Sequence, residues 1–113
     1  MIKLFCLSLL TLGVAFAQSP SLAAGPEILK SECIYIAGKK VKASAICTVK
    51  VYARATSATE EWEWNNGTRT VVKMSDEGIL VNGQEAEKRD ASEIIDVELD
   101  CLGIKATEEI YCR

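Results

Sequence analysis

The hydrophobic and polar residues alternate most regularly between Val41 and Ala53. Every odd position in this stretch is apolar, whereas the even positions are polar or aromatic apart from Ile46. A period of two sustained over this length predicts a long strand with one buried face. The preceding residues predict a shorter strand at about 32–37, joined to the long strand by a turn around residues 38–40.

A second informative stretch runs from Glu60 to Glu87 and contains three predicted turns. The first turn is Asn65-Asn66-Gly67, a three-residue loop whose glycine can adopt a positive φ angle. It predicts the cross-strand pairs Trp64–Thr68, Trp62–Thr70, Glu61–Val71 and Glu63–Arg69. The last pair would bring opposite charges together across the ladder, a contact worth a few tenths to about 1 kcal/mol.

The other two turns extend the same register. Residues 75–78 form a polar four-residue loop, and Asn82-Gly83 suits a tight turn in which both φ angles are positive. These turns predict the pairs Met74–Ile79, Val72–Val81 and Ile79–Ala86. One face then collects the apolar residues Trp62, Trp64, Val72, Met74, Ile79, Val81 and Ala86. Because a slip of one residue would turn this whole set outward, the agreement of three turns supports the register strongly.

The remaining residues also predict strands and turns. Residues 88–93 are charged and suit a loop or a single helical turn, and residues 95–101 alternate like another half-buried strand. Residues 102–105 suggest a turn through Gly103, and residues 109–113 suggest a last short strand. No segment has sustained helical periodicity. We therefore expect an all-β protein, a small antiparallel meander of about seven to eight strands that closes into a barrel or a sandwich.

The start of the chain has the features of a secretory signal peptide. Lys3 precedes a mostly apolar run, and Ala15-Phe16-Ala17 provides the small residues expected before a cleavage site. Cleavage after Ala24 is the competing alternative. The apolar run is shorter than the roughly 20 residues of a membrane-spanning helix, so we expect an exported protein without a membrane anchor. The predicted organisation is a signal peptide at 1–17, a flexible leader at 18–30 and a single β domain at 31–113.

Four of the five cysteines follow the predicted signal peptide: Cys33, Cys47, Cys101 and Cys112. An even number of cysteines in a short exported chain predicts two disulfides, with three compatible connectivities. Setting Cys33 opposite Cys47 also sets Ile34 opposite Ile46, which favours the pairing Cys33–Cys47 with Cys101–Cys112. A Cys33–Cys112 bridge would instead join the first strand to the last.

The charges are distributed unevenly along the chain. Residues 18–59 carry six basic and two acidic side chains, whereas residues 60–113 carry six basic and fourteen acidic ones. This asymmetry could recruit an oppositely charged partner, or the two halves could form complementary faces within one fold. Recognition residues usually lie on loops held by a rigid scaffold. The candidate partner-binding residues are therefore the charged turn residues Lys39, Lys40, Asp76 and Glu77.

The sequence offers little for catalysis. It contains no histidine, and disulfide-bonded cysteines leave no thiolate nucleophile. We therefore expect neither an enzyme nor a cofactor. Three carboxylates alternate along the predicted strand at 95–101, but residues two apart in a strand lie about 7 Å apart, so a solvated edge explains Asp96, Glu98 and Asp100 better than a metal site does.

The two tryptophans allow two interpretations. Trp62 and Trp64 are expected in the core, because their predicted neighbours are apolar and the chain has few other large side chains to fill an interior. An exposed pair would instead form a platform for a carbohydrate or another small ligand.

Several short elements resemble a group of small uncharacterised exported bacterial β proteins over residues 33–113. These elements are Gly38, Cys47-Thr48-Val49, Trp62-x-Trp64 with Asn66-Gly67, Val81-Asn82-Gly83-x-x-Ala86, Cys101-Leu102 and Tyr111-Cys112. More loosely, the chain is similar to the periplasmic inhibitors of c-type lysozyme, small disulfide-containing antiparallel barrels that insert loop side chains into the lysozyme cleft. Their Lys-Gly-x-x-Ala element corresponds to residues 82–86 here without the lysine, and their Ser-Gly-x-x-Tyr element has no counterpart. The resemblance therefore implies a fold more than an activity.

These observations predict an exported binding or inhibitor module of the bacterial cell envelope or secretome, secreted or periplasmic. Its expected partner is another exported or envelope protein, and we expect no nucleic-acid partner. The alternative is a β domain that binds a carbohydrate or small ligand through Trp62 and Trp64.

Overall fold

The computed structural model describes residues 25–113. The predicted signal peptide and residues 18–24 of the predicted leader lie outside the described residues. From residue 25 onward the chain forms eight strands joined by turns and loops. No helix in this part of the chain is long and apolar enough to cross a membrane.

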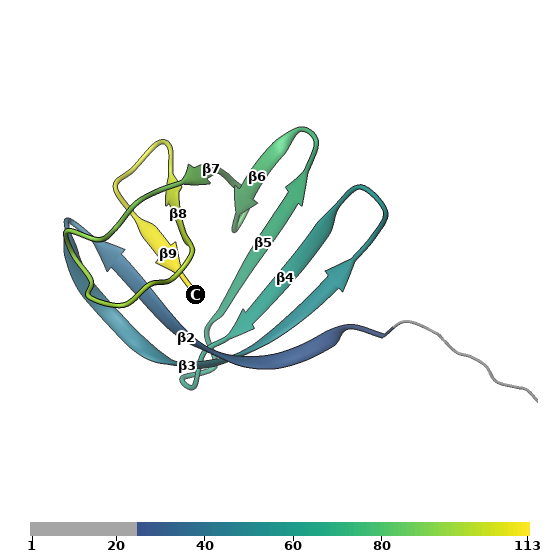
Figure 1. Cartoon of the computed structure of the whole chain (residues 1–113), viewed down its shortest axis with the longest axis horizontal. Coiled ribbons are helices and arrows are strands. Elements are labelled where there is room, and N and C mark those ends of the chain that lie inside the picture. The colour runs from purple at the N-terminus through teal and green to yellow at the C-terminus, as the bar shows by residue number, and fades with distance from the viewer. Residues whose placement is uncertain (1–24) are drawn as a thin grey trace, which may run out of the picture.

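The eight strands, labelled as in Figure 1, form a closed antiparallel barrel in which each strand pairs with the next and the last pairs with the first. They are β2 (Glu27–Ala37), β3 (Lys40–Ala53), β4 (Ala58–Glu63), β5 (Arg69–Ser75), β6 (Gly78–Val81), β7 (Gln84–Lys88), β8 (Cys101–Ile104) and β9 (Ile110–Cys112). The predicted all-β antiparallel meander is confirmed, in its barrel form.

The β2–β3 hairpin is the longest element of the barrel. β2 begins at Glu27, within the predicted leader, because residues 27–30 pair with residues 48–51 of the long strand β3. The turn consists of Gly38 and Lys39, whose φ angles of 59° and 64° are both positive, as a tight two-residue hairpin turn requires. Lys40, predicted in the turn, is the first residue of β3.

This turn sets a register that differs by two residues from the predicted one. Cys33 faces Ala45, whereas the sequence predicted that Cys33 faces Cys47 and that Ile34 faces Ile46. The tight turn and a bulge in β3, where Lys42 is the extra residue opposite Tyr35 and Ile36, fix the observed alignment. The Cys33–Cys47 disulfide forms nonetheless, because an offset of two residues keeps both side chains on the inner face.

The three central turns have the predicted register. The observed pairs include Trp62–Thr70, Glu63–Arg69, Val72–Val81, Met74–Ile79 and Ile79–Ala86. Gly67 has a φ angle of 86°, and the φ angles of Asn82 and Gly83 are 51° and 82°. These positive values explain why glycine and asparagine occupy the turns.

The apolar face set by these turns lines the barrel interior. Trp62 is 1% exposed and Trp64 is 9% exposed, so both tryptophans belong to the core. Other buried members of this inner core are Cys33, Cys47, Val49, Val72, Val81, Ala86, Leu102 and Ile104. The first disulfide therefore lies inside the barrel among the apolar side chains.

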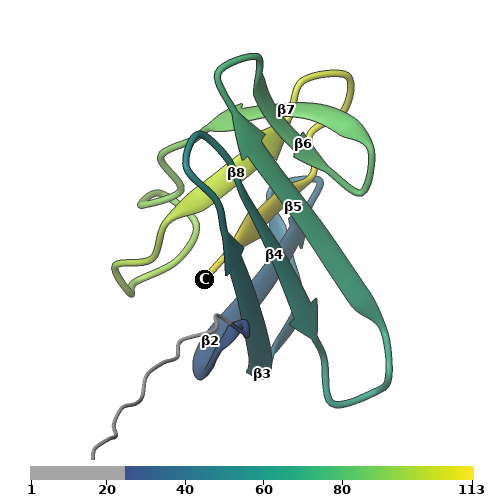
Figure 2. The ribbon, with the colours of Figure 1, turned by 90° about the vertical axis from the view of Figure 1, so that its right-hand side faces the viewer.

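Residues 89–100, between β7 and β8, form a loop, and the predicted strand at 95–101 is wrong. We call this segment the outer loop; Figure 2 shows it leaving the barrel wall beside β8. The backbone N–H groups of Ile94 and Ile95 both donate to the carbonyl of Ala91, which makes a single local turn. Val97, which the alternation predicted to be buried, is 42% exposed.

The outer loop covers a second apolar core on the outside of the barrel. This outer core comprises Ile34, Ile36, Ala91, Ile95, Cys101, Ile110 and Cys112, with Ile94 and Leu99 packed against it. The loop residues thus bury their apolar side chains on the outer face of the sheet without joining its ladder. An alternating pattern cannot distinguish a strand that buries one face from a loop that buries its apolar side chains against the outside of a sheet.

The last two strands close the barrel. Residues 102–104, predicted as part of a turn, belong to β8, whereas the predicted last strand is confirmed as β9. A Cβ atom at Gly103 would lie 2.7 Å from the guanidinium carbon of Arg89. This glycine therefore serves close packing and not a turn.

The second disulfide joins these last strands. Cys101 faces Cys112 directly and is bonded to it, so both predicted disulfides are confirmed. Two disulfides in so short a chain are consistent with an oxidising compartment.

Candidate functional site

One end of the barrel contains a cavity of about 210 Å³ where the β4–β5 and β6–β7 turns meet β2 and β9. It is lined by Tyr35, Ala43, Trp64, Asn66, Thr68, Arg69, Thr70, Asn82 and Tyr111. We call this cavity the aromatic mouth. The mouths of β-barrels are a frequent location of ligand sites that combine aromatic walls with a few polar groups.

Trp64 forms the inner wall of the aromatic mouth. It follows β4 and is held by a hydrogen bond of 3.0 Å from its Nε1 to Oγ1 of Thr70, which is 2% exposed. Because this bond occupies the only donor of the indole, the ring of Trp64 is the group that remains to contact a ligand in the cavity. Trp62 is more deeply buried and does not line the cavity.

Tyr35 and Tyr111 form a second aromatic wall where β2 meets β9. The two residues face each other in the register, and their ring centroids lie 5.0 Å apart. The Tyr35 hydroxyl donates a 2.5 Å hydrogen bond to Oε2 of Glu109. This bond, together with burial and the negative charge of Glu109, raises the pKa of Tyr35 to about 12. Burial and the Glu109 charge also raise the pKa of Tyr111. Both rings are therefore neutral at physiological pH.

Two asparagines build the turns at the rim of the aromatic mouth. The Oδ1 atom of Asn66 accepts a hydrogen bond of 2.9 Å from the N–H of Thr68, and Oδ1 of Asn82 accepts one of 2.9 Å from the N–H of Val71. A backbone N–H can only donate, so these bonds fix the orientation of both side-chain amides. Their amide nitrogens are the groups left for other partners.

Arg69 borders the same rim, but it lies on the outer strand face with Glu63 and not on the inner face with Trp64 and Thr70. The sequence predicted that its charge meets that of Glu63 across the ladder, and the two residues do face each other. Glu63, however, forms its ion pair with Lys50 of β3, at 3.4 Å. Within residues 25–113, no acidic side chain lies within ion-pair distance of Arg69. The predicted charge pair is therefore wrong, because a neighbouring strand supplies a competing lysine.

A second polar cluster joins the barrel interior to the residue after β9. Arg113 donates two hydrogen bonds of 2.8 Å, from Nε and Nη2, to the two carboxylate oxygens of Glu60. Trp62 Nε1 also donates to Glu60, at 2.9 Å. Burial raises the pKa of Glu60, but these hydrogen bonds and the charge of Arg113 outweigh it, so the pKa falls below its ordinary value. Both carboxylate oxygens of Glu60 are hydrogen-bonded within the protein, so this cluster has a structural role.

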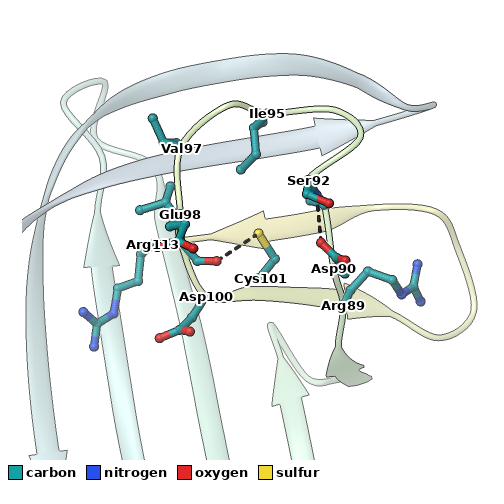
Figure 3. A pocket seen from close by; sticks show the side chains of 11 residues that line it. Arg89, Asp90, Ser92, Ile95, Val97, Glu98, Asp100, Cys101 and Arg113 are labelled. Carbon is teal, nitrogen blue, oxygen red and sulfur yellow. Dashed lines mark hydrogen bonds between the residues drawn. The ribbon is translucent and has the colours of Figure 1, made fainter.

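The outer loop encloses a shallow cavity of about 510 Å³ (Figure 3). Arg89 and Arg113 contribute to its lining, but Figure 3 shows their guanidinium ends pointing away from it. Their partners explain this, since Arg89 pairs with Glu87 and Arg113 with Glu60. The cavity is left with acidic and aliphatic side chains and without a converging set of recognition groups.

The predicted partner-binding residues are exposed but lie apart. Lys39 and Lys40 are at the β2–β3 turn, whereas Asp76 and Glu77 form the β5–β6 turn (Figure 1). Successive turns of an up-and-down barrel alternate between its two ends, so these two turns lie at opposite ends. The acidic turn is stabilised by a hydrogen bond from the N–H of Glu77 to Oγ of Ser75.

The three carboxylates considered as a cation site lie in the outer loop. Asp96, Glu98 and Asp100 are exposed there. Nowhere among residues 25–113 do three or more histidine, cysteine, aspartate or glutamate side chains gather in the arrangement of a metal site.

Sequence analysis did not identify Tyr35, Arg69 or Tyr111 as site residues. The two tyrosines meet only because β2 pairs with β9, an arrangement that no local turn encodes. The alternation did contain a signal for Tyr35, which shares its strand face with Cys33. For Arg69, the only indication in the sequence was its position close to the Asn66-Gly67 turn.

Comparisons with protein-family models, with curated proteins and with solved structures find no match for this chain. The resemblances to exported β proteins and to lysozyme inhibitors therefore stay predictions.

Proposed function

We propose that this protein is an exported, non-catalytic binding domain that holds a small ring-shaped ligand in the aromatic mouth. The observation that carries the proposal is the convergence of Tyr35, Trp64 and Tyr111 on one cavity that also contains polar groups. Aromatic faces bind planar rings and the apolar faces of sugars. A volume of about 210 Å³ suits a single ring rather than a drug-sized molecule.

The rigidity of the walls supports this proposal. Hydrogen bonds join Trp64 to Thr70 and Tyr35 to Glu109. The side chains of the rim asparagines accept hydrogen bonds from the backbone. A site whose side chains are already ordered loses little conformational entropy when a ligand binds. Useful affinity for a small ligand depends on this preorganisation.

A binding role is also favoured over catalysis by the available side chains. The sequence contains no histidine, and all four cysteines within residues 25–113 are disulfide-bonded. The usual nucleophile and base pairs cannot be assembled from these groups. Export to the periplasm or the medium is proposed from the signal-peptide features of residues 1–17 and from the disulfides.

A blocking substitution tests the proposal without disturbing the core. Ala43 is exposed and lines the cavity from β3, so Ala43→Trp should fill the aromatic mouth and abolish ligand binding. Ala53→Trp is the matched control, because Ala53 is also exposed on β3 but does not line the cavity. Binding of a library of small ring compounds would be followed by ¹H–¹⁵N NMR through the Trp64 indole signal. If no compound shifts that signal, or if Ala43→Trp leaves binding intact, the proposal fails.

A second candidate function is binding to an exported protein such as c-type lysozyme. The observation in its favour is the exposed acidic turn of Asp76 and Glu77, which projects from the barrel and is held by Ser75. Electrostatic attraction by such a turn raises association rates and weakens with salt. Replacing both residues by lysine should slow association with lysozyme and leave the fold unchanged. Absence of inhibition at micromolar concentration in a lysis assay would eliminate this candidate.

A further inference from the structure

We infer that the ligand of the aromatic mouth is an organic cation, a ring whose positive charge lies on an alkylated nitrogen in the ring or beside it. The inference rests on the proposed function and names the chemical class of the ligand. It follows from the side chains on the inner face of the barrel at this end, which are aromatic or uncharged, and from one carboxylate that is hydrogen-bonded to the aromatic wall.

Three aromatic side chains meet inside the barrel at the aromatic mouth. Trp64 belongs to the inner core, and Tyr35 and Tyr111 pack against that core, so all three rings lie on the inner side of the wall. They also line the same cavity. The planes of the two tyrosine rings are inclined by 40°, so the rings are not stacked flat on each other. Tryptophan and tyrosine rings attract cations through the negative charge of their π-systems.

Glu109 adds a negative charge to this aromatic wall. Its Oε2 atom accepts the hydrogen bond of 2.5 Å from the Tyr35 hydroxyl, which places the carboxylate at the end of that ring. The hydrogen bond, burial and the charge of Glu109 raise the pKa of Tyr35, and burial and the same charge raise the pKa of Tyr111. The negative charge is therefore felt at both tyrosine hydroxyls, and both rings stay neutral.

No cation opposes this charge on the inner face of the cavity lining. Arg69 is the one cationic side chain among the lining residues, and it lies on the outer strand face with Glu63. Apart from the aromatic residues, the other lining residues are alanine, asparagine and threonine. An anion in the mouth would meet the aromatic wall and Glu109 without a positive partner on the inner face. The lining therefore favours a positively charged ligand.

The hydrogen-bond acceptors of the site indicate the type of cation. The side-chain oxygens of the two rim asparagines accept backbone N–H groups, and Thr70 accepts the Trp64 indole. Both oxygens of Glu109 already accept hydroxyl groups. A primary ammonium would lose water from its three N–H donors and find few acceptors in return. An alkylated nitrogen carries the charge without N–H donors, so it suits this site better.

A matched pair of compounds tests the charge. The oxidised protein would be titrated with 1-methylnicotinamide, a pyridinium cation, and with 3-methylbenzamide, its neutral counterpart of the same shape, while the indole signals are followed by ¹H–¹⁵N NMR. The cation should bind about five- to tenfold more tightly, as expected for a cation–π contact that is partly removed from water. The Trp64 signal should move, and that of the deeper Trp62 should not.

A second pair tests the alkylated nitrogen. Benzyltrimethylammonium and benzylammonium carry the same charge on the same ring, but only benzylammonium has N–H donors. The trimethylated compound should bind more tightly, because it does not need acceptors that the site lacks. Equal or tighter binding of benzylammonium would overturn the assignment to an alkylated nitrogen.

Variants then assign the preference to the aromatic wall and its carboxylate. Glu109→Gln keeps an acceptor for the Tyr35 hydroxyl but removes the charge, so it should weaken binding of 1-methylnicotinamide about two- to threefold and leave 3-methylbenzamide unchanged. Glu108→Gln, on the adjacent exposed residue outside the cavity, should change neither. Tyr111→Phe keeps the ring and should keep the preference for the cation, whereas Tyr111→Leu should reduce it.

The outcomes separate the inference from the proposed function. Binding of 3-methylbenzamide as tight as that of 1-methylnicotinamide would overturn the inference and preserve the binding site. A preference that is undiminished in both Glu109→Gln and Tyr111→Leu would overturn the inference, because the cation would then bind elsewhere. Failure of all four compounds to shift the Trp64 signal would also overturn it. In that case a shift caused by an anionic or uncharged compound of the ring library would preserve the site, and no shift by any compound would remove both.

Discussion

The barrel has two apolar cores on opposite faces of the same wall, and they are built differently. The inner core draws side chains from β2 through β8 and contains both tryptophans. The outer core lies between β2, β8, β9 and the outer loop and is mainly aliphatic. Each contains one disulfide, Cys33–Cys47 inside and Cys101–Cys112 outside.

The two cores differ in which part of the structure must open before each becomes exposed to solvent. The inner core is enclosed by a continuous ladder, so exposing it requires breaking the barrel. The outer core is covered by residues 89–100, which lie outside the strands and make few backbone hydrogen bonds, chiefly at the two ends of the segment and at the local turn. Regions with few such bonds open at a lower free energy than the global unfolding transition. We therefore expect two levels of stability in this one domain.

The largest effect is expected from Trp62→Ala. This side chain is 1% exposed at the centre of the inner core, and truncating a buried tryptophan costs about 3–5 kcal/mol. A domain of this size has only about 5–15 kcal/mol in total. Urea unfolding followed by circular dichroism should show a much lower midpoint or no folded state. A loss below about 1 kcal/mol would mean that the inner core is not the main source of stability.

A smaller and local effect is expected from Ile95→Ala in the outer core. Ile95 is 9% exposed, and the truncation should cost about 2 kcal/mol. Because the outer loop can detach without opening the barrel, amide hydrogen exchange should accelerate at residues 89–100 more than in β4 and β5. Val97→Ala, on an exposed residue of the same loop, is the control. A uniform acceleration over the whole barrel would contradict the two-level description.

The same two regions show where the sequence was informative. Between Glu60 and Glu87 each strand pairs with its sequence neighbour through a short turn, so local turn chemistry determined the register correctly. The outer loop has an alternating pattern as clear as that of a strand, yet its apolar residues are buried by covering a sheet face formed elsewhere. Which surface buries an apolar side chain is a long-range property that alternation does not encode.

In the candidate site, too, local turns were predictable from the sequence and long-range contacts were not. Trp64 was recognised, because it lies next to a predictable turn. The tyrosines join it only through the β2–β9 pairing, and Arg69 lacks a partner only because Lys50 competes for Glu63. The first arrangement depends on a contact between strands that are distant in the sequence. The second depends on a lysine from β3, which lies outside the β4–β5 hairpin. A pattern confined to one hairpin cannot predict such contacts.

The smallest expected effect concerns Glu60→Gln, which tests the connection between the two regions. Arg113 binds Glu60 of β4 through its side chain, and its backbone exchanges two hydrogen bonds of 3.0 Å with Asp100 of the outer loop. Removing the carboxylate charge should cost on the order of 1–2 kcal/mol at neutral pH. It should also accelerate hydrogen exchange at the Asp100 and Arg113 amides.

The pH dependence distinguishes this charge from a purely steric contact. The pKa of Glu60 in the folded protein lies below its ordinary value of 4.5, so the unfolded chain takes up its proton first as the pH falls. The stabilisation by the pair is therefore complete above about pH 4.5 and is lost as the pH drops through the lower, folded value. Urea midpoints of the wild type and Glu60→Gln should differ at pH 7 and converge in acid. Glu61→Gln, on the adjacent residue that pairs with Val71, should show no such convergence. A difference between wild type and Glu60→Gln that stayed constant in acid would mean that the carboxylate acts by its shape, and that its charge does not join the outer loop to the barrel.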